Sequence, residues 1–132
     1  MFTLGVSDHV MVAHTLADPV FGLAQRLHGA TYAIDLQIRV TELGRHNVVM
    51  DIGVLRSTLR AVLDEFDYSN LDEHPAFSGI VSTTERVAEH IAARVAERIR
   101  GLAPDEMPEP GATLTVMARE SPLAYAGYEC KL

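Results

Sequence analysis

One alternating segment constrains the fold of this chain more than any other. From His28 to Val40, large apolar side chains occupy every second position from Tyr32 onward, and polar or small side chains lie between them. A two-residue period is typical of a β-strand with one buried side and one solvent-facing side. The segment therefore predicts a sheet that packs on other elements with one face and meets water or a lumen with the other.

The rest of the chain supplies three more strands and two helices around this segment. Strands are predicted at residues 2–16, 28–40, 113–119 and 124–131, and helices at 54–66 and 82–101, the second opening on a capping-box pattern. This order predicts an α+β fold: a four-stranded antiparallel sheet with two helices on one face. Such a sheet has open edges, and closure into a barrel by oligomerisation removes them.

Length and composition narrow the class of protein. At 132 residues, the chain is expected to form a single domain spanning residues 1–132. A formal net charge of −7 argues against a nucleic-acid partner and against docking on anionic membranes. No apolar run reaches the roughly 18 residues of a membrane span, and the N-terminus lacks a signal-peptide pattern. We expect a cytoplasmic protein that acts on a small molecule.

Two histidines raise the question of a metal. His14 and His28 end and begin neighbouring predicted strands, and two imidazoles placed in this way can share one Zn²⁺ if both face the same side. Ala30, two residues after His28, lies on the same face and cannot bind a metal. Single histidines are more often ordinary polar residues, so the pair alone leaves both interpretations open.

A third zinc ligand would have to come from elsewhere. His9 is one candidate, but its odd spacing from His14 puts it on the other face unless a β-bulge intervenes. His46 and His74 qualify only if their loops fold over the site. His90 is expected on the solvated face of its helix, and Cys130, the only cysteine, is expected to be an inert thiol.

Six segments, in order, carry a resemblance to a known family. They are VAHTL at 12–16, LHGATY at 27–32, VMDI at 49–52, FDYSNL at 66–71, STTE at 82–85, and RES at 119–121 followed by Tyr128. They resemble the Ala-Ala-His-x-Leu, Leu-His-Gly-His-x-Tyr, apolar-Asp-Phe, Leu-Asp-His-x-x-Leu-Asn, Pro-Thr-Ser-Glu and Glu-Thr…Tyr segments of the 6-pyruvoyl-tetrahydropterin synthase and 6-carboxytetrahydropterin synthase family.

The resemblance implies a fold, an assembly and a chemistry. Members of this family have the tunnelling fold and form trimeric barrels, two of which stack into a homohexamer with active sites between subunits. As lyases they use Zn²⁺ held by three histidines, a cysteine with an Asp-His pair for proton transfer, and a glutamate that anchors the pterin ring.

Only part of the zinc and proton-transfer machinery carries over. His14 and His28 match two zinc ligands, while Ala30 stands at the third. Ala24 stands where the catalytic cysteine is usual. A bound Zn²⁺ therefore stays an open alternative, with His9 as a possible third ligand.

The relay and the ring anchor are better preserved. Asp67 matches the relay aspartate, and Tyr68 replaces its histidine, so these two are the catalytic candidates, although Tyr68 could also be a loop aromatic. Glu120 matches the ring anchor, and Thr83 and Thr84 match the neighbouring substrate contacts. Thr83 could also cap its helix.

These matches and losses support two functions. The first is a divergent enzyme of the family, acting on a pterin-like or other small heterocyclic or carbonyl substrate without the usual cysteine. The second is a catalytically inactive protein on the same scaffold that binds a pterin or purine. A retro-aldol or hydrolytic reaction ranks last, because Lys131 is the only lysine and lies at the extreme C-terminus.

Overall fold

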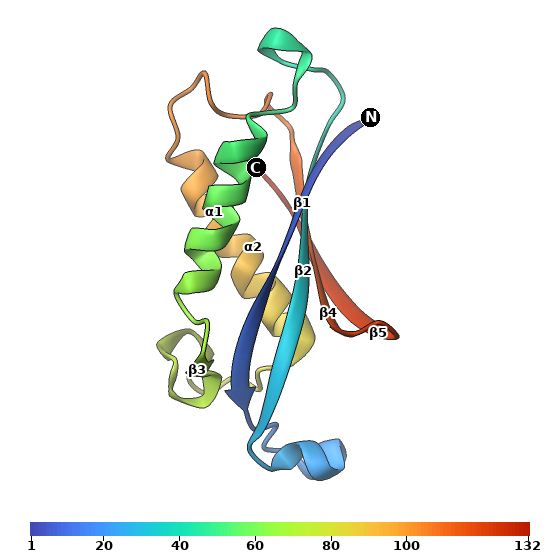
Figure 1. Ribbon diagram of the computed structural model, residues 1–132, viewed down its shortest axis with the longest axis vertical. Coiled ribbons are helices and arrows are strands. Elements are labelled where there is room, and N and C mark those ends of the chain that lie inside the picture. Colours follow the sequence, from blue (N-terminus) through green and yellow to red (C-terminus); the bar gives the residue numbers. More distant parts are fainter.

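The computed structural model describes all residues, 1–132, as a twisted sheet with two α-helices on one face (Figure 1). The strands are β1 (Phe2–His14), β2 (His28–Val40), β3 (Ser69–Asn70), β4 (Thr113–Ser121) and β5 (Ala124–Lys131), and the helices are α1 (Ile52–Asp64) and α2 (Thr84–Arg100). The sheet order is β3-β1-β2-β4-β5. The α+β class is as predicted, and both helices lie within two residues of their expected starts.

The sheet differs from the prediction in one strand. It has five strands and is mixed, because β3 pairs in parallel with Val12 and Ala13 of β1. The chain turns sharply after α1, where Tyr68 has a positive φ of 56°, and then runs back along the edge of β1. Two residues carry no periodicity, so a strand this short could not be detected from the sequence.

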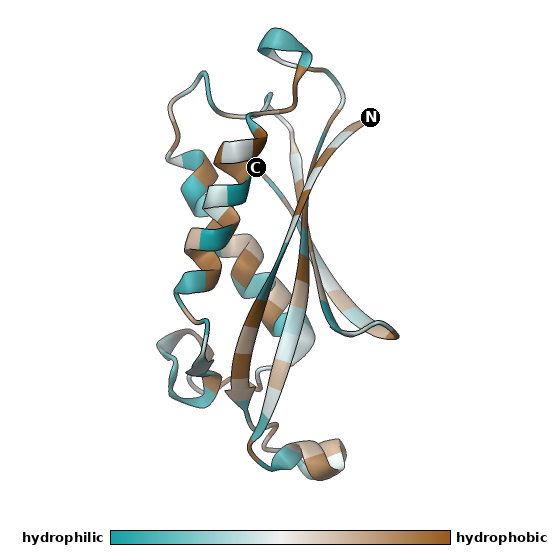
Figure 2. Ribbon diagram, in the orientation of Figure 1, coloured by the Kyte–Doolittle hydropathy of each residue, from teal (hydrophilic) through white to brown (hydrophobic).

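The alternation in β2 produces the core. Tyr32, Ile34, Leu36, Ile38 and Val40 are all buried beneath the helices, as the two-residue period predicts. Helix α1 buries Leu55, Leu59, Val62 and Leu63 against them, and α2 buries Val87, Ile91, Val95 and Ile99. Figure 2 shows the apolar side of each helix turned toward the sheet.

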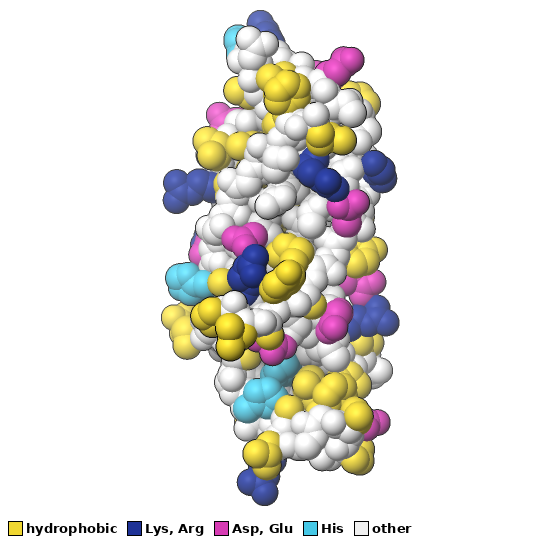
Figure 3. Space-filling view, turned by 90° about the vertical axis from the view of Figure 1, so that its right-hand side faces the viewer, with side chains coloured by type: hydrophobic (Ala, Val, Ile, Leu, Met, Phe, Trp, Pro, Cys, Tyr) yellow, Lys and Arg dark blue, Asp and Glu magenta, His cyan; other side chains and the backbone are white.

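The opposite face of the sheet is polar. Asp35 on β2 accepts hydrogen bonds from Ser7 on β1 (2.6 Å) and Arg119 on β4 (3.3 Å), and Arg39 pairs with Glu129 on β5 at 2.5 Å. In Figure 3, acidic, basic and apolar side chains are interspersed over this side of the molecule. This face of the sheet thus carries ion pairs between strands, whereas the helices cover the other face.

Both long edges of the sheet are open. Strand β1 has β2 on one side, and on the other side only Val12 and Ala13 are paired, with β3. Strand β5 pairs with β4 alone.

Neither α1 nor α2 combines the length and the apolar character that a membrane-spanning helix requires.

Candidate functional site

The two histidines meet at one end of the sheet. His14 is the last residue of β1 and lies directly opposite His28, the first residue of β2, with the ring centroids 4.6 Å apart and the ring planes at 57°. Both occupy the helix-facing side, because they are in phase with the buried residues of their strands. His14 is only 3 % exposed, whereas His28 is half-buried, so the pair reaches solvent through His28.

Both rings are oriented through Nδ1. The Nδ1 of His28 lies 2.8 Å from the carbonyl oxygen of Arg26 and must donate to it, which leaves Nε2 with a lone pair in the neutral ring. The Nδ1 of His14 is hydrogen-bonded to Ser82 Oγ at 2.9 Å. Burial lowers the pKa of His14, and the nearby His28 lowers it further, so His14 is held neutral.

A third imidazole does not approach the pair within one chain. The β1–β2 register runs without a bulge from Phe2 opposite Val40 to His14 opposite His28, so His9 stays on the opposite, exposed face. Because no β-bulge intervenes, the structure does not bring His9 to the pair within one chain. His46 lies in the loop after β2, at the far end of the sheet.

No other combination of ligands compensates. His74 packs against Phe66, Phe77 and His90 instead of the pair. Nowhere in the chain do three or more His, Cys, Asp or Glu side chains gather in a way that could hold a metal ion. The donor set for a three-histidine zinc site is thus incomplete.

Glu120 lies at the same end of the sheet and on the same face. It follows Arg119, which is paired with Ala33 of β2, and its Oε1 accepts a hydrogen bond from the hydroxyl of Thr84. Thr84 also hydrogen-bonds the phenol of Tyr32, which is 1 % exposed. Burial raises the pKa of Tyr32, and the charge of Glu120 adds to this rise, so the phenol stays protonated.

The start of α2 connects the two halves of the site. Ser82 contacts His14, Thr83 caps the helix by accepting from the backbone N–H of Arg86, and Thr84 contacts Glu120. The capping function expected of Thr83 is therefore present, and of the two threonines it is Thr84 that reaches the carboxylate. The N-terminus of α2, with its partial positive charge, therefore lies beside the carboxylate of Glu120.

Asp67 and Tyr68 lie elsewhere, on the outer edge of β1. One oxygen of Asp67 accepts from the backbone N–H groups of Met11 (2.9 Å) and Tyr68 (3.0 Å), and the other accepts from Arg60 (2.9 Å). Tyr68 is 80 % exposed. Strands β1 and β2 separate this edge from Glu120 on β4, so one chain does not bring the two catalytic candidates to the ring anchor.

Several contacts around the site could not be anticipated from the sequence. Arg60 binds Asp8 and Asp64 as well as Asp67, at 3.1, 2.9 and 2.9 Å. Asp72 accepts from the backbone and the hydroxyl of Thr15, just after His14. These contacts depend on the folded path of residues 65–83, for which the only local sequence signals are the proline and the capping box.

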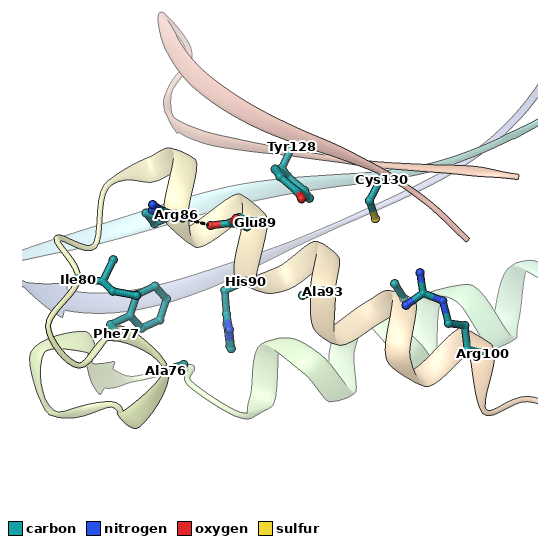
Figure 4. Close-up of a pocket in the computed structure, with 11 residues that line it drawn as sticks. Ala76, Phe77, Ile80, Arg86, Glu89, His90, Ala93, Arg100, Tyr128 and Cys130 are labelled. Atoms are coloured by element: carbon teal, nitrogen blue, oxygen red, sulfur yellow. Dashed lines mark hydrogen bonds and ion pairs between the residues drawn. The ribbon is translucent and has the colours of Figure 1, made fainter.

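His90 is not on a solvated face, contrary to expectation. Its ring lies 5.3 Å from that of Phe77 and 5.7 Å from that of Phe66, and its buried Nε2 has no hydrogen-bond partner. Burial lowers its pKa, and His74 lowers it further. Figure 4 shows His90 beside Phe77 at the margin of a cavity of about 430 Å³, with Tyr128 and Cys130 across from it on β5.

Cys130 is partly buried on β5 and lies away from the histidine pair. Burial raises the pKa of its thiol, which disfavours the nucleophilic thiolate. Ala24, within the 3-10 helix Pro19–Gln25, has no side chain that could transfer a proton. The chain therefore offers no thiolate at the candidate site.

Known proteins resemble this chain over almost its whole length. The family model for 6-pyruvoyl tetrahydropterin synthase matches residues 3–131. The 6-carboxy-5,6,7,8-tetrahydropterin synthase of Bacillus subtilis is 27 % identical, over 98 % of this chain and 86 % of that protein.

Solved structures agree on the fold. The 6-pyruvoyl tetrahydropterin synthase of Caenorhabditis elegans matches with a TM-score of 0.79 at 23 % identity, over 98 % of this chain and 95 % of that one. A Plasmodium vivax 6-pyruvoyltetrahydropterin synthase, solved as a variant of a catalytic residue, matches with a TM-score of 0.77 at 18 % identity, over 99 % and 98 % of the two chains. The chain belongs to the 6-pyruvoyl tetrahydropterin synthase family.

Proposed function

We propose that this protein is a divergent pterin-synthase-like enzyme that binds a pterin or a similar flat heterocycle and transforms its side chain without a catalytic cysteine. Membership of the family supports a pterin-synthase-like function. The observation that carries the proposal is the position of Glu120, which lies on the same face and at the same end of the sheet as the two imidazoles.

Glu120 is proposed as the ring anchor. A carboxylate can accept two parallel N–H bonds from a 2-amino-4-oxo heterocycle, and such charge-assisted pairs are strong and geometrically specific. The hydroxyl of Thr84 uses one lone pair of Oε1 and fixes the carboxylate, so the remaining lone pairs stay available to a ligand. Thr83 and Thr84 are proposed to border the ring.

The substrate side chain would then lie toward His14 and His28. The Nε2 of His28 carries a lone pair that can accept a hydrogen bond from a substrate hydroxyl. Family enzymes commonly depend on zinc, but within one chain only two histidines meet at this site, so no step is assigned to a metal.

Asp67 and Tyr68 are proposed to supply proton transfer from a neighbouring subunit. Three features lie toward the end of the sheet that carries His14. They are Met11 on β1, Glu120 on β4 and the first residues of β5. If the free edge of β1 in one subunit pairs with β5 of the next, the strands remain antiparallel and Tyr68 approaches the Glu120 end of its neighbour.

Ring closure also explains the two open edges. Exposed strand edges invite pairing with another chain, and a closed barrel removes them. We propose a homo-oligomer, a trimer or a homohexamer of two stacked trimers, that acts in the cytoplasm. The polar face of the sheet, with its ion pairs between Arg39 and Glu129, would line the lumen of the barrel.

A second function fits the same set of residues. Ala24 removes the usual acid/base group, and general acid/base help is commonly worth about 10²–10⁴-fold in rate. A protein that binds a pterin or purine without turnover would keep Glu120 and Thr84 and lose only such groups. The enzyme is favoured if the exposed Tyr68 reaches the site of a neighbouring subunit, because a binding protein has no need of such a group.

Turnover and binding measurements separate these functions. Purified protein is incubated with dihydroneopterin triphosphate and the products are resolved by chromatography, while a pterin is titrated calorimetrically. Binding with a specific side-chain product supports the enzyme, and stoichiometric binding without any product supports the inactive binder. Absence of pterin binding at millimolar ligand contradicts both.

A further inference from the structure

We propose that the imidazole pair forms a two-histidine site that does not retain zinc, and that the side chain at position 30 is what decides this. The inference rests on the proposed function and deepens it, because it concerns the same site. It rests on His14 and His28 and on the groups that surround them. The two histidines supply two ligands of a tetrahedral zinc site, and the surrounding groups supply no further ligand.

The first two corners are well formed. His14 and His28 face each other from adjacent strands, and each has its Nδ1 hydrogen-bonded, to Ser82 Oγ and to the carbonyl oxygen of Arg26. Zinc-bound histidines typically use such outer contacts on the second nitrogen to fix the ring, which leaves Nε2 for the metal. Loss of zinc binding therefore does not come from disorder of these two rings.

The third corner is apolar. Residues two apart on a strand project to the same side, so the side chain that follows His28 on this face of β2 is Ala30. Its partner on β1 is Val12, which is buried. A methyl group and an isopropyl group thus occupy the positions from which a third ligand could reach the two Nε2 atoms.

The nearby oxygens are already engaged. Asp72 lies close enough to His14 to influence its charge, but its Oδ1 and Oδ2 accept from the N–H (3.1 Å) and the hydroxyl (2.9 Å) of Thr15. Ser82 is bound to His14 Nδ1, and the phenol of Tyr32 is bound to Thr84. Each of these groups is thus held by a hydrogen bond within the chain, and none of them gathers with the two imidazoles into a group that could hold a metal ion.

Two histidine ligands alone are expected to bind zinc weakly. Structural zinc sites use four protein ligands and catalytic sites three, with water at the open position. Outer contacts alone change metal affinity by about 10–100-fold, so the loss of a direct ligand weakens zinc binding by at least that factor. The two imidazoles then act on a ligand through hydrogen bonds.

The test is the zinc content of wild-type protein and of Ala30→His. After dialysis against zinc-free buffer and re-addition of one equivalent of ZnCl₂, followed by gel filtration, wild type is expected to carry less than about 0.1 zinc per chain. Ala30→His is expected to carry about one and to bind zinc at least about 100-fold more tightly. Adding His14→Ala to Ala30→His should abolish this gain.

Ala33→His is the matched control. Ala33 lies on the same strand but on the exposed face, opposite His9, so a histidine there cannot join the pair. It should leave the zinc content at the wild-type level, which separates geometry from the mere addition of an imidazole.

Wild-type protein that retains about one zinc per chain, lost on His14→Ala, would overturn the inference, including the case in which another subunit supplies the third ligand. A folded Ala30→His, verified by circular dichroism and light scattering, that gains no zinc would overturn it as well. If Ala30→His does not fold, the wild-type measurement still decides whether the pair retains zinc. Zinc is measured without any pterin, so failure here is distinguishable from failure of pterin binding.

Discussion

The hydroxyl of Thr84 donates a hydrogen bond to the carboxylate of Glu120, and this contact joins the first turn of α2 to the end of β4. It fixes one oxygen of the proposed ring anchor. It also makes the anchor dependent on the position of a helix that begins two residues after Ser82, which contacts His14.

Replacement of Thr84 by Val should loosen the anchor. The variant keeps the shape of the side chain but removes the donor to Glu120 and the partner of the buried Tyr32 phenol. A net hydrogen bond is worth about 0.5–1.5 kcal/mol, so we expect unfolding free energy to fall by about 1–2 kcal/mol and pterin affinity to fall by about 3–10-fold.

Thr115→Val is the control for that variant, measured by urea unfolding and calorimetry. Thr115 also lies on β4 and also donates to a carboxylate, that of Glu129, but on the exposed face. An equal loss of pterin affinity in both variants would show that Thr84 does not act through Glu120.

Arg60 should matter more for stability than a surface arginine usually does. It binds Asp8 on β1, Asp64 on α1 and Asp67 in the following loop, so Arg60→Met leaves three carboxylates without their shared cation. Because these groups are partly solvated, we expect a loss of only about 1 kcal/mol in urea unfolding. Arg56→Met, at an exposed position of the same helix, should change stability little; equal losses would contradict the proposed network.

Stability should decline as the pH falls below about 6.5, in part through His90. Burial holds its folded pKa below the ordinary histidine value of about 6.5, so in mildly acidic solution the unfolded chain takes up a proton that the folded chain does not. The stabilisation is therefore present above this pH and is lost below it.

His90→Phe should reduce this decline. The new ring fits among Phe66, Phe77 and His74 and removes the buried Nε2 that lacks a partner. Urea midpoints at pH 7 and pH 5 should lie closer together than in wild type, although His14, whose pKa is also lowered, keeps part of the slope. His46→Gln, in the exposed loop after β2, is the control, and an unchanged pH dependence in His90→Phe would contradict the assignment.

The free edge of β1 should be required for assembly. Met11 directs its N–H and carbonyl outward, to Asp67 and Tyr68, so by alternation the N–H of Ser7 also points away from β2. Ser7→Pro removes this donor and should convert the oligomer to monomers in light scattering, whereas Ser7→Ala should leave it assembled. A wild-type monomer, or an intact Ser7→Pro oligomer, would contradict edge pairing.

The predictable parts of the molecule are those with a local period. The alternation of apolar residues in β2 and the apolar stripe of α2 determine which of their side chains are buried. Both patterns can be recognised within a short stretch of sequence. Family motifs located Glu120, His14 and His28, and the register of β1 and β2 brings the two histidines together.

Contacts between distant segments could not be predicted in this way. Ser82 meets His14 across 68 positions, and His90 is enclosed by a loop whose path depends on β3 and on the hydrogen bonds of Asp67 and Asp72. A helical period can place His90 next to buried positions but cannot reveal that the loop at Phe77 covers it.

The most direct test of the central claim is calorimetric titration of a pterin into wild type, Glu120→Gln and Glu42→Gln. Glu42 is exposed just beyond the far end of β2 and serves as the matched control. A hydrogen bond to a charged group is worth about 1.5–3 kcal/mol, so Glu120→Gln should weaken binding by about 10–100-fold while Glu42→Gln binds as wild type does. Equal affinity in all three proteins would contradict a ring anchor at Glu120.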